Sequence, residues 1–236
     1  MQNPNSNLCI VSLSGGMDSA TVLGVAVASG FRPLAVAFRY GSKHNYMELG
    51  AACNIANHYD VGLKIIDVRN VFAHLNSALM DPSVAIPEGF YEGENMRQTV
   101  VPGRNLIFLS ILAAEAESRG IPEVMLGIHS GDHHIYPDCR PEFYEASRNA
   151  VNLSTDRKVD FKAPFLYGNK ETIIRRGLSI GVPYHLTRTC YKSDTIACGV
   201  CGSCQERLDA FAKCDVDDPI EYASRKLIPS LISVSL

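Results

Sequence analysis

Four cysteines crowd into fifteen residues near the end of the chain: Cys190, Cys198, Cys201 and Cys204. Thiolates at this spacing can surround one tetrahedral metal ion, and Gly199 and Gly202 allow tight turns between them. Because four thiolates leave no position for water, a zinc ion held here would be structural. The same ligands could hold an iron–sulfur cluster. Disulfide pairing is the third interpretation, and it would need an oxidising compartment.

A second chemically suggestive segment lies near the beginning of the chain, where the apolar run 8–13 stops at Ser14-Gly15-Gly16-Met17-Asp18-Ser19. Residues 20–28 follow with helical composition, so the segment reads as strand, glycine turn and helix. Backbone amides at a helix start lack intrahelical partners and lie at the positive end of the helix dipole. The sequence therefore predicts an anion site. The alternative is an ordinary turn in which Asp18 or Ser19 caps the helix.

A third group of polar side chains occupies residues 129–140, directly after an expected strand. Two carboxylates, a tyrosine and an arginine gather there: Asp132, Tyr136, Asp138 and Arg140. Such density is typical of a ligand pocket. Cys139 precedes an expected helix start, which could lower its pKa and make it a nucleophile.

Arg104 follows a Pro-Gly pair at the start of another expected helix. Its guanidinium could hold a carboxylate or phosphate in a bidentate fork. A solvated arginine in the first helical turn is the alternative.

The elements that must position these groups alternate along the chain. Apolar runs predict strands at 8–13, 34–38, 63–68, 123–128 and 159–165, and periodic patterns predict helices at 20–28, 45–58, 106–119, after Pro141 and at 170–178. This order predicts an α/β fold, a doubly wound and mainly parallel sheet of about five strands. Residues 70–100 show little periodicity and are expected to form a long loop. Ligands of such sheets bind beyond the carboxyl ends of the strands, where the glycine segment lies.

Charge and composition exclude several classes of function. The 236 residues carry 22 Lys and Arg against 25 Asp and Glu, a formal charge of -3, which disfavours a broad nucleic-acid footprint. Residues 1–7 are polar without a basic region, and no apolar run approaches the length of a membrane span. We therefore expect a cytoplasmic protein that does not bind membranes, and the charge disfavours nucleic acid as a partner without excluding it.

The glycine segment matches neither the Walker loop nor the GxGxxG fingerprint. It resembles the pyrophosphate-binding loop of the ATP pyrophosphatase (PP-loop) superfamily. The resemblance implies that Ser14, Gly15, Gly16 and Ser19 contact the phosphates of ATP and that Asp18 helps to place Mg²⁺. The implied nucleotide-binding segment comprises Leu13, Ser14, Gly15, Gly16, Met17, Asp18, Ser19, Ala20, Thr21, Val22 and Leu23.

Further segments resemble one family within this superfamily, the 7-cyano-7-deazaguanine synthases of queuosine precursor synthesis. They are Tyr-Gly-Ser-Lys-His at 40–44, Val-Pro-Gly-Arg-Asn at 101–105, Tyr-Pro-Asp-Cys-Arg-Pro-Glu-Phe at 136–143 and the cysteine quartet. The chain departs from the family at Asp132-His133-His134, where Asp-Tyr-Ser is frequent.

This second resemblance implies ATP-dependent conversion of 7-carboxy-7-deazaguanine and ammonia to 7-cyano-7-deazaguanine, through an activated carboxylate and an amide. The implied enzyme is a ligase that forms carbon–nitrogen bonds. Its expected catalytic residues are Asp18, Lys43 and Arg104, and its expected contacts to the deazapurine are Asp132, Tyr136, Asp138 and Arg140.

The resemblance also implies an organisation. An ATP-binding domain of the adenine nucleotide alpha hydrolase type is expected over residues 1–184, followed by a segment at 185–236 that holds one zinc ion and packs on the same domain. A homodimer is expected. Two alternatives stay open: a PP-loop enzyme that thiolates tRNA, and a protein that binds ATP and deazaguanine without turnover.

Overall fold

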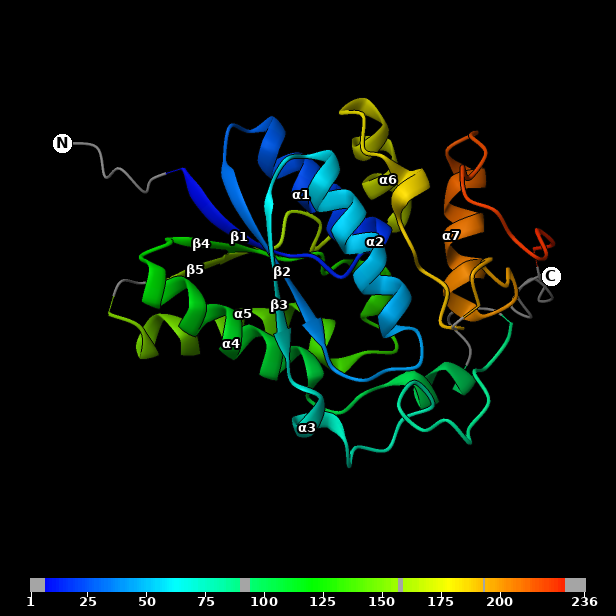
Figure 1. Cartoon of the computed structure of the whole chain (residues 1–236), viewed down its shortest axis with the longest axis horizontal. Helices are drawn as coiled ribbons and strands as arrows, with labels where there is room; N and C mark the ends of the chain where they lie inside the picture. Colours follow the sequence, from blue (N-terminus) through cyan, green and yellow to red (C-terminus); the bar gives the residue numbers. More distant parts are fainter. Residues whose placement is uncertain (1–6, 90–93, 157–158, 193, 228–236) are drawn as a thin grey trace, which may run out of the picture.

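The computed structural model describes residues 7–89, 94–156, 159–192 and 194–227. In these residues five strands form one sheet in the order β3-β2-β1-β4-β5, and every pairing in it is parallel, as predicted (Figure 1). The strands are β1 (Leu8–Ser12), β2 (Arg32–Arg39), β3 (Gly62–Asp67), β4 (Glu123–Met125) and β5 (Asp160–Lys162). The doubly wound α/β fold expected from the sequence is confirmed.

Helices cover both faces of this sheet. Figure 1 shows α1 (Met17–Ala28), α2 (Asn45–His58) and α6 (Lys170–Ser179) above it and α4 (Arg104–Arg119) and α5 (Pro141–Ser154) below it. Successive residues of β1 point to opposite faces, as the pleat of a strand requires. Cys9 and Val11 accordingly pack in the core under α1, whereas Ile10 packs with Leu112 of α4.

Two of the predicted strands are shorter than expected. The interpretation of 123–128 as one strand is wrong after Met125, because the chain turns there to approach the glycine segment: a Cβ on Gly127 would lie 3.2 Å from the amide nitrogen of Ser19. The prediction of 159–165 as one strand is wrong after Lys162, since Pro164 cannot donate to a sheet ladder.

Two short helical elements interrupt the predicted loop at 70–100: α3 (Arg69–Phe72) and a 3-10 helix, η1 (Glu94–Thr99). Met96 and Thr99 of η1 are fully buried, so this end of the segment belongs to the core. A further helix, α7 (Gly202–Lys213), was not predicted, and it packs against α6.

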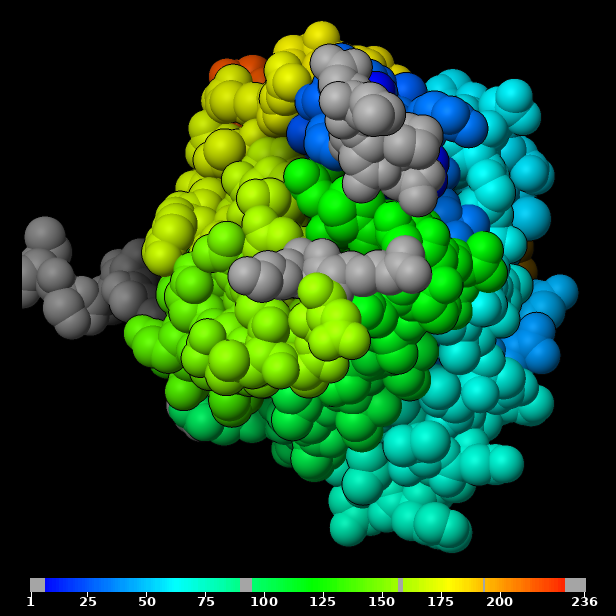
Figure 2. Space-filling model, turned by 90° about the vertical axis from the view of Figure 1, so that its left-hand side faces the viewer, coloured from blue at the N-terminus to red at the C-terminus, as the bar shows by residue number. Residues whose placement is uncertain are grey.

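Figure 2 shows the end of the molecule at which β1 begins. The colours there run from cyan on the right through green to yellow on the left, which follows the order of the sheet from β3 to β5. In Figure 1, α7 stands at the opposite end, beyond the carboxyl ends of the strands. Among the described residues, no helix is both long and apolar enough to cross a membrane.

Candidate active site

The glycine segment joins β1 to α1 at the carboxyl end of the central strand, which pairs with β2 on one side and β4 on the other. This is the position at which the chain reverses its winding direction along the sheet, where open α/β sheets bind their ligands. Gly15 has a φ of +89°, and a Cβ there would lie 2.3 Å from the carbonyl oxygen of Glu48 in α2. Only glycine therefore allows α2 to approach the segment so closely.

Hydroxyl groups fix the shape of this turn. Ser19 Oγ accepts the Ser14 N–H at 3.2 Å and donates to the Gly16 carbonyl at 3.1 Å, while Ser14 Oγ accepts the Gly16 N–H at 3.3 Å. Gly16 is the N-cap of α1, and within the described structure no side chain caps this helix. The alternative in which Asp18 or Ser19 caps the helix is therefore wrong, and the first-turn amides can bind an anion.

A buried cluster of charged groups lies beside the turn. Lys170, at the start of α6, is 7% exposed, and its Nζ lies 3.4 Å from Asp18 Oδ2 and 2.6 Å from Glu206 Oε2 in α7. Burial disfavours the charged ammonium, but Asp18 and Glu206 outweigh that effect and raise the pKa of Lys170. Burial also raises the pKa of Glu206. The ammonium is therefore charged at neutral pH.

His129 completes this cluster and is fully buried. Its Nδ1 accepts the Gly131 N–H at 3.1 Å, so a neutral ring carries its proton on Nε2. Nε2 lies 3.4 Å from Asp132 Oδ2, 3.7 Å from Asp18 Oδ2 and 3.4 Å from Lys170 Nζ, so two carboxylates and an ammonium surround it. With both nitrogens engaged in this way, His129 is poorly suited to ligate a metal.

The oxygen atoms of the cluster suit a hard cation better. Asp18 Oδ1 is buried and has no hydrogen-bond partner among the described residues. Three carboxylates, Asp18, Asp132 and Glu206, face one ammonium, so the cluster has an excess of negative charge. A divalent cation with oxygen ligands, such as Mg²⁺, fits this donor set.

A cleft runs from the turn along the carboxyl end of β2 to α4. Its charged end is lined by Ser14, Asp18, Asp132 and Lys170, and its other wall is lined by Tyr40, His44, Glu48, Arg104, Phe108 and Tyr191. The Arg104 guanidinium carbon lies 5.9 Å from the centre of the Tyr40 ring. Burial opposes the charge of Arg104, but Tyr40 and Asp138 nearby raise its pKa.

The residues predicted as substrate contacts lie at different depths. Asp132 lines the cleft, whereas Tyr136, Asp138 and Arg140 are not among its lining residues. Asp138 Oδ2 accepts the Asn105 N–H at 3.0 Å in the first turn of α4. The Tyr136 hydroxyl meets those of Thr99 and Tyr191, at 2.8 and 3.2 Å.

The two remaining predicted cations also face protein groups. Arg140 is exposed, and its Nε donates to the His133 carbonyl at 2.9 Å. Lys43 also lies outside the lining of the cleft, and its ammonium donates to the carbonyl of Val84.

Cys139 is buried at 4% exposure and accepts a hydrogen bond from the Asn105 side-chain amide at 3.2 Å. Burial raises the pKa of its thiol well above the usual value. The expectation of a lowered pKa is therefore wrong: the side chain lies among apolar groups, and nearby Asp132 and Asp138 further disfavour a thiolate.

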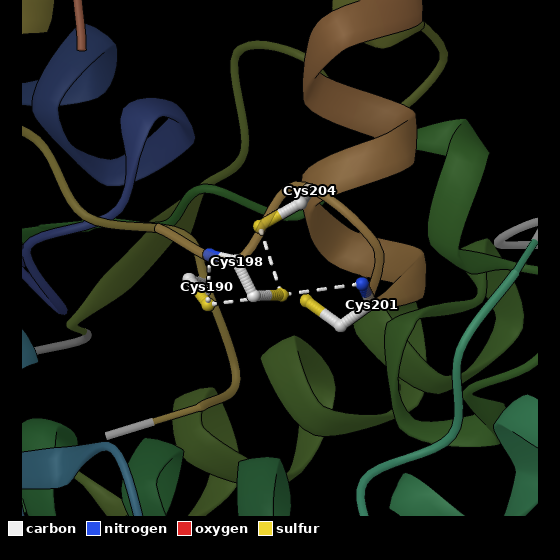
Figure 3. A group of neighbouring side chains, drawn as sticks. All are labelled: Cys190, Cys198, Cys201 and Cys204. Atoms are coloured by element: carbon white, nitrogen blue, oxygen red, sulfur yellow. Dashed lines mark hydrogen bonds between the residues drawn. The ribbon is translucent and has the colours of Figure 1, made fainter. Parts of the chain in front are cut away.

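The four clustered cysteines converge on one point beside α7 (Figure 3). Their sulfur atoms all lie within 4.8 Å of one another, and Sγ of Cys198 is 3.6 Å from that of Cys190 and 3.9 Å from that of Cys204. Thiolates bound tetrahedrally to one zinc ion are about 3.8 Å apart. All eight cysteines lie in the described residues, and none forms a disulfide. The cluster could therefore hold a single metal ion.

One feature of the predicted cysteine turns needs correction. Gly199 has a φ of +76° and lies in a tight turn as expected, but Gly202 is the first residue of α7. Cys204 therefore projects from a helix instead of a second glycine turn. Backbone N–H groups of Val200 and Cys201 point at Cys198 Sγ, at 3.4 and 3.3 Å, which favours a thiolate there.

Two contacts join the cysteine segment to the glycine turn and its helix. The Arg188 N–H donates to the Gly15 carbonyl at 2.8 Å, two residues before the first cysteine of the cluster. The Tyr184 hydroxyl lies 2.9 Å from Thr21 Oγ1 in α1. The cysteine segment and the predicted nucleotide loop therefore support each other.

The sequence-based reasoning missed His129, Lys170 and Glu206 as members of the site. His129 stands at the start of the polar loop that was singled out, which was a usable signal. Nothing in the local sequence marks Lys170 or Glu206, because their importance comes from contacts between distant segments.

A parallel sheet, a glycine turn at its switch point and an acidic cluster with a buried lysine beside it are suited to binding an anionic ligand beyond the carboxyl ends of the strands. The family model described as "Queuosine biosynthesis protein QueC" matches residues 8–215, and the chain belongs to that family.

Curated relatives agree over nearly the whole chain. The 7-cyano-7-deazaguanine synthase of Caldicellulosiruptor bescii is 48% identical over 90% of this chain and 96% of its own, and that of Pseudoalteromonas atlantica is 45% identical over 90% and 97%. Among solved structures, the NMN synthetase of Francisella tularensis is 14% identical with a TM-score of 0.49, covering 79% of this chain and 66% of its own.

Proposed function

We propose that this protein makes 7-cyano-7-deazaguanine from 7-carboxy-7-deazaguanine, ammonia and ATP. The observation that carries the proposal is the 48% identity, over 90% of the chain, to a relative named for this product. The cleft supports it, since an uncapped helix start suited to phosphates opens into a wall of aromatic and charged side chains suited to a heterocyclic acid.

The chemistry requires two activations at one carbon. A carboxylate is a poor electrophile, so one of its oxygens must first be joined to a phosphoryl or adenylyl group of ATP as a mixed anhydride. Ammonia then attacks the carbon, and the amide forms as that oxygen leaves with the phosphate group. The amide oxygen then needs the same activation before it can leave. A single nucleotide site next to a single heterocycle site serves both steps, because the acid and the amide differ only at the reacting group.

For the nucleotide, we assign the first-turn amides of α1 and the hydroxyls of Ser14 and Ser19 to the phosphates. Asp18 and Asp132 would hold Mg²⁺, which neutralises phosphate charge when bound. The Lys170 ammonium would stabilise negative charge that develops on the phosphates, since it is buried beside Asp18. Arg104 would hold the carboxylate of the heterocycle. The predicted roles of Lys43, Tyr136, Asp138 and Arg140 remain predictions.

For the cysteine cluster, we propose one structural zinc ion per chain. The compact arrangement of its sulfurs supports a single ion over a larger cluster. We also propose that residues 185–236 act as a zinc-binding appendage to an ATP-binding domain at 1–184, in a cytoplasmic homodimer.

The test uses the whole protein with 7-carboxy-7-deazaguanine, ATP, Mg²⁺ and ammonium, followed by mass spectrometry of the product and measurement of phosphate release. The wild-type protein is expected to form the nitrile. Asp18→Asn should lower kcat by about 100-fold or more, because the metal-bound phosphates lose their placement. Asp209→Asn, at an exposed aspartate of α7, is the matched control and should behave as wild type.

Two results would count against the proposal. Binding of both ligands without release of either phosphate or pyrophosphate would indicate a non-catalytic binding protein. Near-normal turnover by Asp18→Asn, at an unchanged melting temperature, would show that the nucleotide site has been misassigned.

A further inference from the structure

The aromatic wall of the cleft contains a histidine and a glutamate with no role so far, His44 and Glu48. His44 is 2% exposed, and its Nε2 lies 3.4 Å from Glu48 Oε1. Its Nδ1 is buried without a hydrogen-bond partner among the described residues. A buried polar atom left unpaired costs free energy, so its place in the lining of a cleft indicates a missing ligand group.

The glutamate is held firmly in position. Its carbonyl oxygen packs against Gly15, as described above, so its backbone touches the phosphate-binding turn. Asn45, one turn earlier, ties the start of α2 to the end of β2: its Oδ1 accepts the Tyr40 N–H at 2.9 Å, and its Nδ2 donates to the Phe38 carbonyl at 3.0 Å. A group bound by Glu48 would therefore lie next to the phosphates.

The carboxylate of Glu48 is ionised at neutral pH. Burial alone would raise its pKa, but the neighbouring His44 and Arg104 lower the pKa below its usual value. An ionised carboxylate offers about four lone-pair positions. The contacts with His44 and Asn45 account for two of them, which leaves acceptor capacity on a residue that lines the cleft.

The other carboxylates near the cleft have different surroundings. Asp18 and Asp132 lie in the charged cluster with His129 and Lys170, and Asp138 accepts a backbone N–H of α4. Glu48 is instead accompanied by Tyr40, Phe108 and Tyr191, whose rings line the same cleft. An acid between flat apolar rings is suited to the edge of a heterocycle.

We propose that Glu48, positioned by His44, reads the deazaguanine by accepting hydrogen bonds from its N1–H and its 2-amino group, while Arg104 holds the C7 carboxylate. The assignment rests on the proposed function and places the substrate against Glu48 and Arg104, in place of the predicted contacts Asp138 and Arg140, which lie outside the lining of the cleft. Adenine has an acceptor at N1 and no 2-amino group, so a carboxylate there repels it. Glu48 would thereby keep the adenine of ATP out of the deazaguanine position.

The experiment compares Glu48→Gln with the wild-type protein on two substrates: 7-carboxy-7-deazaguanine and its analogue without the 2-amino group. Steady-state KM values are measured for each substrate and for ATP. Glu48→Gln should raise KM for the natural substrate roughly 10- to 100-fold, the range of a hydrogen bond to a charged group, and leave KM for ATP within about 2-fold. The preference of the wild type for the 2-amino compound should largely disappear in the variant.

Glu145→Gln, at a glutamate 57% exposed on α5, is the matched control and should change neither KM. Glu48→Asp is the second variant, for use if Glu48→Gln does not fold. Its side chain keeps the negative charge but is one methylene shorter, so its KM for the deazaguanine should lie between those of the wild type and of a variant without the charge. A higher KM for ATP with an unchanged KM for the deazaguanine would assign Glu48 to the ribose hydroxyls and overturn the proposal. An unaltered preference for the 2-amino compound would overturn it too. Absence of product from the wild type would instead refute the proposed function.

Discussion

Replacing Asp218 by asparagine should destabilise the protein by about 3–5 kcal/mol, the usual cost of breaking a buried ion pair on one side. Asp218 and Arg207 have fully buried side chains, and the carboxylate accepts from Arg207 Nε at 2.7 Å and Nη2 at 2.8 Å. The guanidinium also donates to Thr187 Oγ1 at 2.6 Å. Asparagine would keep one acceptor and turn an N–H toward the guanidinium, which leaves a buried charge uncompensated.

For a chain of this size, that loss corresponds to a melting temperature lower by roughly 6–20 °C. The assay is thermal unfolding at equal metal content. The control is Asp217→Asn, at an exposed neighbouring residue, and its free energy of unfolding is expected to be within about 0.5 kcal/mol of that of the wild type. The double variant Arg207→Met with Asp218→Leu should recover much of the loss, because it removes both charges. A shift below about 2 °C for Asp218→Asn would refute the reasoning, as would a double variant less stable than the single one.

Two further outcomes can be checked in the same preparations. Gly15→Ala should weaken ATP binding and lower the melting temperature more than the control Gly30→Ala does. Both glycines have a positive φ. A Cβ at Gly30 would meet nothing within 4 Å, whereas a Cβ at Gly15 would meet the backbone of α2. Equal effects on KM for ATP would contradict a role for that contact. Metal analysis should find about one zinc per chain, lost together with the fold in Cys201→Ser but retained in Cys53→Ser, whose thiol is exposed. A brown protein containing iron and sulfide would contradict the zinc assignment.

The central strands of the sheet could be predicted from the sequence because they are buried on both faces. Runs such as residues 8–13 carry continuous apolar side chains, and the alternation with helices leaves few parallel topologies. The predicted ends of the strands were less accurate, since the end of a strand depends on the segments that pack against it. For example, β4 stops where Gly127 meets the backbone of the glycine turn.

The helix α7 could not be predicted because its burial does not follow an apolar stripe. Gln205 and Arg207 are both buried, at 3% and 0% exposure, and their polar groups are satisfied by distant segments. The residues of the candidate site likewise fall into a part that the sequence predicted and a part that it did not. The glycine turn and the cysteines are local patterns, whereas the acidic cluster exists only because α6 and α7 bring Lys170 and Glu206 to Asp18.

The hydrogen bond from Arg188 to Gly15 has a thermodynamic consequence for the two ligands of the molecule. One end of this bond stands two residues before the first of the four clustered cysteines, and the other lies in the glycine turn that we propose binds the phosphates. If metal at the cysteines increases the affinity for nucleotide by some factor, nucleotide must increase the affinity for metal by that same factor. A chain saturated with ATP would then keep a metal ion at a higher chelator concentration than the free chain, so the supply of substrate would favour the metal-bound form.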